Sequence, residues 1–159
     1  MDPLKELMLG PPRLTLAAAE SLTTGRIQAR IGAISGASEF FLGGITAYSL
    51  AQKVRHLGVN RELAEPVDSV SAAVAEQMAA GARVLFGADV AVATTGYAEA
   101  APAKSVAAPF AWWAVAGGPG RIRSGRIDCP GLARTEVQER VAEAALAALL
   151  AWLREIRGR

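Results

Sequence analysis

The segment from Ala88 to Thr95 constrains the fold of this chain more than any other segment. It reads Ala-Asp-Val-Ala-Val-Ala-Thr-Thr, a nearly continuous run of small and β-branched residues. A strand with one solvated face alternates apolar and polar residues, whereas a continuous run is typical of a strand buried on both faces. The segment therefore predicts a central strand of a covered sheet.

Strand and helix patterns alternate along the rest of the chain. Apolar segments predict strands at 13–19 and 40–49, and a late hairpin pairs 109–116 with 121–127 around Gly117-Gly118-Pro119-Gly120. Helical spacing and capping residues predict helices at 4–9, 26–34, 50–57, 61–64, from the Ser71 cap to about Phe86, and 134–156. This order predicts an α/β fold, a three-layer α/β/α domain with a mixed, mainly parallel sheet.

The size and composition of the chain favour one soluble domain. With 159 residues it is long enough for a single well-buried core, so we expect one domain over 1–159. Hydrophobic residues make up 52% of the chain, and much of this share is alanine. No apolar run reaches the roughly 18 residues that a spanning helix needs. The N-terminus lacks the basic and apolar regions of a signal peptide, which predicts a cytoplasmic protein.

Charge and metal-ligand counts exclude several kinds of partner. The formal net charge is +2, and the basic residues are spread out apart from 121–126 and 154–159, which argues against nucleic acid as a partner. Cys129 is the only cysteine and His56 the only histidine, so a disulfide, a thiolate cluster and a zinc site are not expected. We expect no cofactor, no metal and no membrane partner.

Residues Ala19 to Gly25 (Ala-Glu-Ser-Leu-Thr-Thr-Gly) lie where a predicted strand meets a predicted helix. Small and hydroxyl residues at such a turn let backbone N–H groups point into a shared cavity, and a helix start favours negative charge. A nucleophilic serine, Ser21, or a phosphate ligand could each use this place. A plain helix cap is the structural alternative for Ser21.

Tyr48 and Lys53 follow at a second turn from strand to helix. A serine needs a neighbouring base to act as a nucleophile, and a lysine can serve once burial populates its neutral amine. Both residues could face the turn that carries Ser21, and backbone N–H groups of residues 23–25 could then hold an oxyanion. A half-buried strand tyrosine and an exposed helix lysine are the structural alternatives.

Several segments, in order along nearly the whole chain, carry a family resemblance. The first, Glu20-Ser-Leu-Thr-Thr-Gly25, matches the motif Glu-Ser-Cys-Thr-Gly-Gly at four of six positions. Further matching segments are 36–38, 41–49, Lys53, 57–59, 70–71, 81–83, 87–91 and Thr95-Gly96. Together they resemble the C-terminal domain of the CinA competence/damage-inducible family, which includes the nicotinamide mononucleotide amidohydrolases.

The resemblance implies a serine–lysine amidohydrolase that acts on the carboxamide of nicotinamide mononucleotide or a related small molecule. It implies that Ser21 is the nucleophile and that Tyr48 and Lys53 assist it as catalytic residues. The resemblance and the turn after Ala19 together predict these substrate-binding positions: Thr23, Thr24, Gly25, Thr95, Gly96 and Arg134. The resemblance also implies a homo-oligomer. Glu20 is expected to pair with Lys53 rather than to act as a pocket carboxylate.

The chain departs from the family in the loop that follows Thr95-Gly96, where the family has more glycines. Side chains replace the backbone freedom of glycine there, and Glu99 brings a negative charge that would disfavour a phosphate facing the pocket.

This departure supports a second hypothesis, a non-catalytic homologue that serves as a ligand-binding or protein-interaction module. In that case Tyr97, beside Trp112 and Trp113, would replace the ligand with packed rings. A nucleotide-binding regulator is a third hypothesis, which rests only on the anion sites at helix starts.

Overall fold

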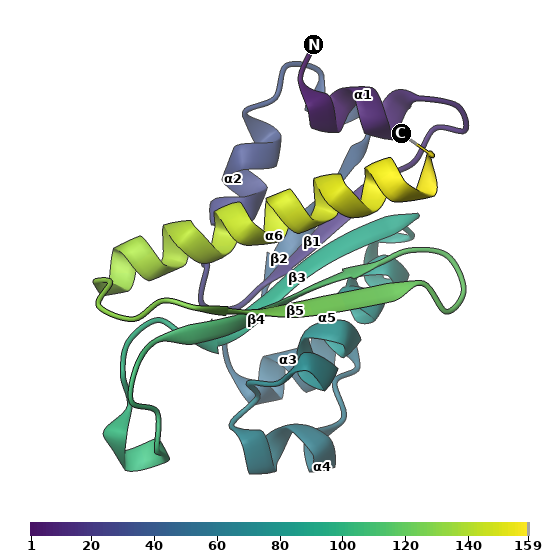
Figure 1. The fold of residues 1–159 in the computed structure, drawn as a ribbon. Helices are drawn as coiled ribbons and strands as arrows, with labels where there is room; N and C mark the ends of the chain where they lie inside the picture. The colour runs from purple at the N-terminus through teal and green to yellow at the C-terminus, as the bar shows by residue number, and fades with distance from the viewer. Residues whose placement is uncertain (159) are drawn as a thin grey trace.

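A five-stranded mixed sheet forms the middle of the molecule in the computed structural model, which describes residues 1–158 (Figure 1). Its strands are β1 (Leu16–Glu20), β2 (Phe41–Thr46), β3 (Val90–Tyr97), β4 (Phe110–Ala116) and β5 (Ile122–Asp128), in the order β2-β1-β3-β4-β5. β1 pairs in parallel with both β2 and β3, while β4 pairs antiparallel with β3 and β5. Among the described strands only β4 therefore runs against the common direction, as a mixed, mainly parallel sheet requires.

Helices cover both faces of this sheet, which confirms the predicted three-layer fold (Figure 1). On one face lie α1 (Pro3–Leu9), α2 (Arg26–Gly32) and the long α6 (Arg134–Ile156). On the other lie α3 (Leu50–Leu57), α5 (Ala72–Phe86) and, beside them, α4 (Arg61–Ala64). Short 3-10 turns occupy 37–39, 65–67 and 102–104.

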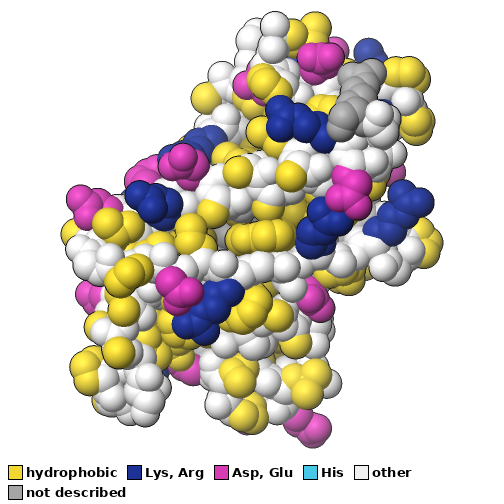
Figure 2. Space-filling view, in the orientation of Figure 1, with side chains coloured by type: hydrophobic (Ala, Val, Ile, Leu, Met, Phe, Trp, Pro, Cys, Tyr) yellow, Lys and Arg dark blue, Asp and Glu magenta, His cyan; other side chains and the backbone are white. Residues whose placement is uncertain are grey.

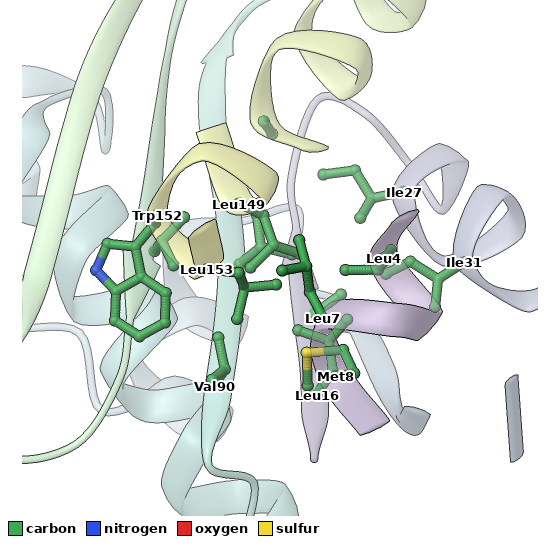
Figure 3. Close-up of a cluster of buried hydrophobic side chains, with 14 of the residues drawn as sticks. Leu4, Leu7, Met8, Leu16, Ile27, Ile31, Val90, Leu149, Trp152 and Leu153 are labelled. Atoms are coloured by element: carbon green, nitrogen blue, oxygen red, sulfur yellow. The ribbon is translucent and has the colours of Figure 1, made fainter. Parts of the chain in front are cut away.

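Two cores of different character separate the layers. Large side chains fill the space under α6, where Leu149 and Leu153 meet Leu16 of β1 and Met8 of α1 (Figure 3). The opposite face of the sheet carries small side chains toward α5, and we call it the alanine face: Ala17, Ala19, Ala91, Ala93, Ala114 and Ala116. Methyl groups let α5 lie close to the sheet. Gly81 of α5 extends this close packing, since a Cβ at that position would collide with the Leu57 carbonyl of α3.

Most predicted elements are confirmed, and the differences lie at their ends. The helix predicted at 26–34, for example, ends at Gly32. The helices at 50–57, 61–64 and 134–156 have their predicted limits, and Ser71 caps α5 by accepting a bond from the Val74 amide. The predicted strand at 13–19 starts later, at Leu16. The predicted strand at 40–49 ends at Thr46, because Ser49 instead caps α3. Residue 159, the end of the predicted domain, lies outside the described residues.

Charges of both signs are interleaved on the molecular surface. On the face shown in Figure 2, Lys and Arg side chains lie next to Asp and Glu side chains. Several ion pairs among residues 1–158 join positions far apart in the chain, such as Lys5–Glu39 and Arg123–Glu155. Of the helices in residues 1–158, none combines the length and apolar character needed to cross a membrane.

Candidate active site

A cleft of about 480 Å³ opens at the carboxyl ends of β1, β2 and β3. Parallel strands place the residues that follow them at one edge of the sheet, which is where α/β proteins bind ligands. Ser21 directly follows β1, Tyr48 and Lys53 follow β2, and Thr95 and Gly96 lie near the end of β3. The cleft is lined by Ser21, Leu22, Tyr48, Ser49, Leu50, Lys53, Glu65, Asp68, Ser69, Val70, Thr95, Gly96, Tyr97 and Lys104.

Lys53 and Ser21 meet in the wall of this cleft. Lys53 Nζ donates a hydrogen bond to Ser21 Oγ at 2.9 Å and another to the Tyr48 carbonyl at 2.8 Å. Lys53 belongs to α3, whose first turn is fixed by the Ser49 cap, and its side chain is only 2% exposed. The structural alternative, in which Lys53 is an exposed helix lysine, is therefore wrong.

Burial changes the acidity of this lysine. Loss of solvation lowers the pKa of Lys53 from 10.5 to about 8, and the charge of Asp68 partly opposes that shift. With a pKa of about 8, roughly a tenth of the amine is neutral at pH 7. Lys53 can thus accept the proton of Ser21 within ordinary physiological pH.

Tyr48 contributes two different groups to the site. Its backbone carbonyl holds Lys53, while its side chain is 53% exposed and turns to the rim of the cleft. There the hydroxyl accepts a hydrogen bond from Arg134 Nη2 at 2.9 Å. Arg134 Nη1 in turn lies 3.1 Å from Glu99 Oε1. Tyr48 therefore links Arg134, at the start of α6, to the edge of the cleft.

The structure does not bring the predicted residues 23–25 into the cleft lining. Thr23 is fully buried, and its hydroxyl bonds to Glu20 Oε1 at 2.6 Å and to Thr94 Oγ1 at 2.8 Å. The Thr24 amide donates to the Ser21 carbonyl, and the Thr24 hydroxyl accepts from Arg26. Gly25 provides the left-handed residue, at φ 94°, that precedes α2. The three residues shape the turn behind Ser21.

The expected pairing of Glu20 with Lys53 is wrong. The fully buried Glu20 carboxylate accepts bonds from the amides of Ile27 and Gln28, from the Gln28 side chain and from Thr23. A carboxylate at a helix N-terminus satisfies amides that have no partner inside the helix and complements the helix dipole. Glu20 therefore anchors α2 to the end of β1, next to Ser21.

Thr95 and Gly96 do line the cleft. The Thr95 hydroxyl donates to the Ser69 carbonyl at 2.7 Å and ties β3 to the loop before α5. A Cβ at Gly96 would collide with Ala111 of β4. Gly96 is thus required by the close approach of two strands.

The site contains a carboxylate that sequence patterns did not reveal, Asp68. It accepts a hydrogen bond from Lys104 Nζ at 2.6 Å and one from the Tyr97 hydroxyl at 3.0 Å. The Lys104 bond is the main cause that lowers the pKa of Asp68. Burial, together with the bond to Asp68, raises the pKa of Tyr97 to about 12. Asp68 and Ser69 both have positive φ angles, 51° and 61°, which residues other than glycine adopt infrequently.

Aromatic rings do not fill the cleft. Tyr97 is part of the lining and packs against Phe110, with ring centroids 5.5 Å apart and planes at 56°. Trp112 and Trp113 pair in the sheet with Thr95 and Thr94 instead of stacking on Tyr97. Within residues 1–158 no group of three or more His, Cys, Asp or Glu is arranged to hold a metal ion.

Comparison with known proteins identifies the family. The model of the CinA C-terminal domain matches residues 6–153. The chain belongs to the CinA C-terminal domain family. A CinA-like protein of Mycolicibacterium vanbaalenii is 41% identical over 148 residues, which cover 91% of this chain and 34% of that protein. The chain spans between a fifth and about a third of the curated CinA relatives it matches.

Solved structures of CinA-family proteins share the fold over nearly the whole chain. The competence or damage-inducible protein of Enterobacter asburiae has a TM-score of 0.88 at 30% identity, covering 95% of this chain and 94% of that one. The competence/damage inducible protein CihA of Agrobacterium tumefaciens has a TM-score of 0.83 at 29% identity, with 94% and 90% covered. The CinA fold thus accounts for the complete three-layer domain described above.

Proposed function

We propose that this CinA domain is an amidohydrolase that hydrolyses the carboxamide of a small molecule such as nicotinamide mononucleotide. One observation carries the proposal: Lys53 Nζ lies 2.9 Å from Ser21 Oγ in the wall of an open cleft. A buried lysine with a lowered pKa beside a serine is the arrangement that activates a hydroxyl without histidine.

The reaction that we infer has two halves. Neutral Lys53 accepts the proton of Ser21 while Oγ attacks the carboxamide carbon, and the same proton then passes to the leaving nitrogen, which departs as ammonia. In the second half Lys53 accepts a proton from water, whose oxygen attacks the ester carbon. The proton returns to Ser21, and the carboxylic acid leaves. Amide and water are consumed, acid and ammonia are produced, and the chain is restored.

The remaining predicted residues take supporting places in this proposal. Tyr48 orients Lys53 through its carbonyl and holds Arg134 at the rim through its hydroxyl. Thr95 and Gly96 form part of the wall against which the substrate lies. We further propose a cytoplasmic homo-oligomer with a small-molecule substrate and no cofactor.

The open cleft favours catalysis over the alternative of a non-catalytic module. A module would be supported by Tyr97 or Phe110 filling the place of the ligand. Instead Tyr97 is one of the residues that line a cleft of about 480 Å³, and Phe110 lines an adjoining cavity.

Ammonia release from nicotinamide mononucleotide tests the proposal. We expect turnover by the unaltered protein and a loss of about a thousandfold or more in Ser21→Ala and in Lys53→Ala, as for other activated nucleophiles. Ser38→Ala and Lys5→Ala, which lie outside the cleft, are the matched controls. Turnover that survives Ser21→Ala across a panel of carboxamides would contradict the mechanism, and a protein that only binds them would support the module.

A further inference from the structure

Three cations other than Lys53 lie around the cleft, and each is held by a carboxylate. Lys104, in the cleft lining, pairs with Asp68 at 2.6 Å. Arg134, which reaches the rim through Tyr48, pairs with Glu99 at 3.1 Å.

Arg126 is the third of these cations, and it lies outside the lining of the cleft that contains the serine. It lines an adjoining cavity of about 630 Å³, where it sits over the Phe110 ring and pairs with Asp128 at 2.9 Å. This cavity continues the cleft, since the two share Glu65, Asp68, Val70, Tyr97 and Lys104. A ligand extending from the serine along the cleft would therefore meet cations that are already paired.

The lining of the cleft itself contains charged side chains of both signs. They are Lys53, Lys104, Glu65 and Asp68, two cations and two carboxylates. Both carboxylates are paired, Asp68 with Lys104 at 2.6 Å and Glu65 with Arg61 of α4 at 3.4 Å. Since the proposed mechanism requires Lys53 to be neutral, the reactive state of the cleft offers an anion no cation in the lining that is not already paired.

We propose that this cleft selects carboxamides that carry no phosphate, whether neutral or cationic, over their phosphorylated counterparts. The inference rests on the proposed function. A phosphate group would have to displace Glu99 from Arg134 or Asp68 from Lys104 and would leave a carboxylate facing it. A carboxamide without a phosphate, by contrast, binds without breaking either ion pair. Glu99 and Asp68 are then specificity-determining residues, because their ion pairs with Arg134 and Lys104 keep those cations from binding a phosphate.

Binding to the Ser21→Ala protein separates this inference from turnover. The probes are nicotinamide riboside and nicotinamide mononucleotide, which differ only by the phosphate, and the measurement is calorimetry at pH 8.5 and low salt. We expect the riboside to bind at least as tightly as the mononucleotide. Adding Glu99→Gln frees Arg134 and should shift the ratio of the two affinities by about two- to tenfold toward the mononucleotide.

Glu143→Gln in the same Ser21→Ala background is the matched control. Glu143 is exposed on α6 and lies outside the cleft lining, so its loss changes the net charge equally without touching Arg134. A parent protein that prefers the mononucleotide would overturn the inference. An affinity ratio that is the same with and without Glu99→Gln would overturn it as well.

Inorganic phosphate supplies a second test that needs no pyridine compound. We expect the Arg134 side-chain nitrogen signals of the Glu99→Gln protein to shift on phosphate titration, and those of the unaltered protein to shift far less. Equal responses would overturn the inference even if neither pyridine compound binds. Ammonia release by the unaltered protein decides the proposed function separately, since a protein that hydrolyses the mononucleotide faster than the riboside keeps that function and loses this inference.

Discussion

Lys53 Nζ and Ser21 Oγ are 2.9 Å apart although 32 positions separate the two residues in the chain. Neighbouring parallel strands, β1 and β2, deliver them to the same edge of the sheet. The ammonium group has a second acceptor, the Tyr48 carbonyl, so its position is set by backbone as well as by the serine. The contact between Lys53 and Ser21 therefore arises from strand order and one capped helix.

The rate of carboxamide hydrolysis should depend on pH through Lys53. Its pKa of about 8 means that the neutral amine becomes the main form only above that value. We expect kcat/KM to rise about tenfold per pH unit below pH 8 and to level off above it. A pH–rate profile that is flat from pH 6 to 9 would contradict this role.

The free energy of unfolding should follow the same group with a defined sign. The folded pKa of Lys53, about 8, lies below its ordinary value of 10.5. Between these values the unfolded chain binds the additional proton, so the contribution of Lys53 to stability increases as pH rises from 8 toward 10.5. Urea titrations across this window measure the free energy of unfolding of the unaltered protein and of Lys53→Met. The difference between the two should grow with pH, and a difference that does not change with pH would contradict the lowered pKa of Lys53.

Asp68→Asn should move the midpoint of the pH–rate profile to lower pH. The carboxylate of Asp68 raises the pKa of Lys53, and removing it also leaves Lys104 without its 2.6 Å partner. Both changes disfavour a charged Lys53. Glu62→Gln, an exposed change on α4, serves as the control for net charge. A midpoint that moves upward would mean that Asp68 does not act on Lys53.

Tyr48→Phe should alter substrate binding more than the chemical step. The substitution keeps the carbonyl that holds Lys53 and removes only the hydroxyl that accepts from Arg134. We expect KM to rise by about two- to tenfold with kcat changed by less than that, as for the loss of one exposed charge-assisted hydrogen bond. Steady-state kinetics of the variant and the unaltered protein measure both constants. A fall of kcat by a hundredfold or more would instead indicate that the phenol relays a proton.

Glu20→Gln should lower the free energy of unfolding by about 1–3 kcal/mol. The buried carboxylate accepts two backbone amides and two side-chain donors at the start of α2, and an amide group cannot replace all four acceptor contacts. Urea denaturation with Glu143→Gln as the exposed control measures the difference. A change within about 0.5 kcal/mol would show that the carboxylate charge is dispensable there.

The parts of the structure that follow local rules could be predicted from the sequence. Caps such as Ser49 and Ser71 define helix starts, and the apolar run at 88–95 marked the buried central strand. The Ser21 and Lys53 positions came from a strand-to-helix pattern and a family motif. Their contact could be expected because both follow parallel strands at one edge of the sheet.

Other parts depend on contacts that no local pattern encodes. Asp68 reaches the cleft through a left-handed turn, and its partners Tyr97 and Lys104 are 29 and 36 positions away. Glu20 was misassigned because the amides of α2, seven and eight positions on, outcompete Lys53 for its oxygens. Hydroxyl residues such as Thr23 looked suited to a ligand, and the fold uses them to brace the turn.

The alanine face determines where new specificity can be built into this domain. A longer side chain at Ala17, Ala91 or Ala114 would have to push α5 away from the sheet. On its other side α5 already contacts α3 closely, since Gly81 leaves no room for a Cβ beside the Leu57 carbonyl. Protein engineers are thus left with the two connecting segments at 65–69 and 98–109 as the parts that can be varied. Mutant libraries aimed at a different carboxamide should vary only those segments and leave the residues of the sheet unchanged.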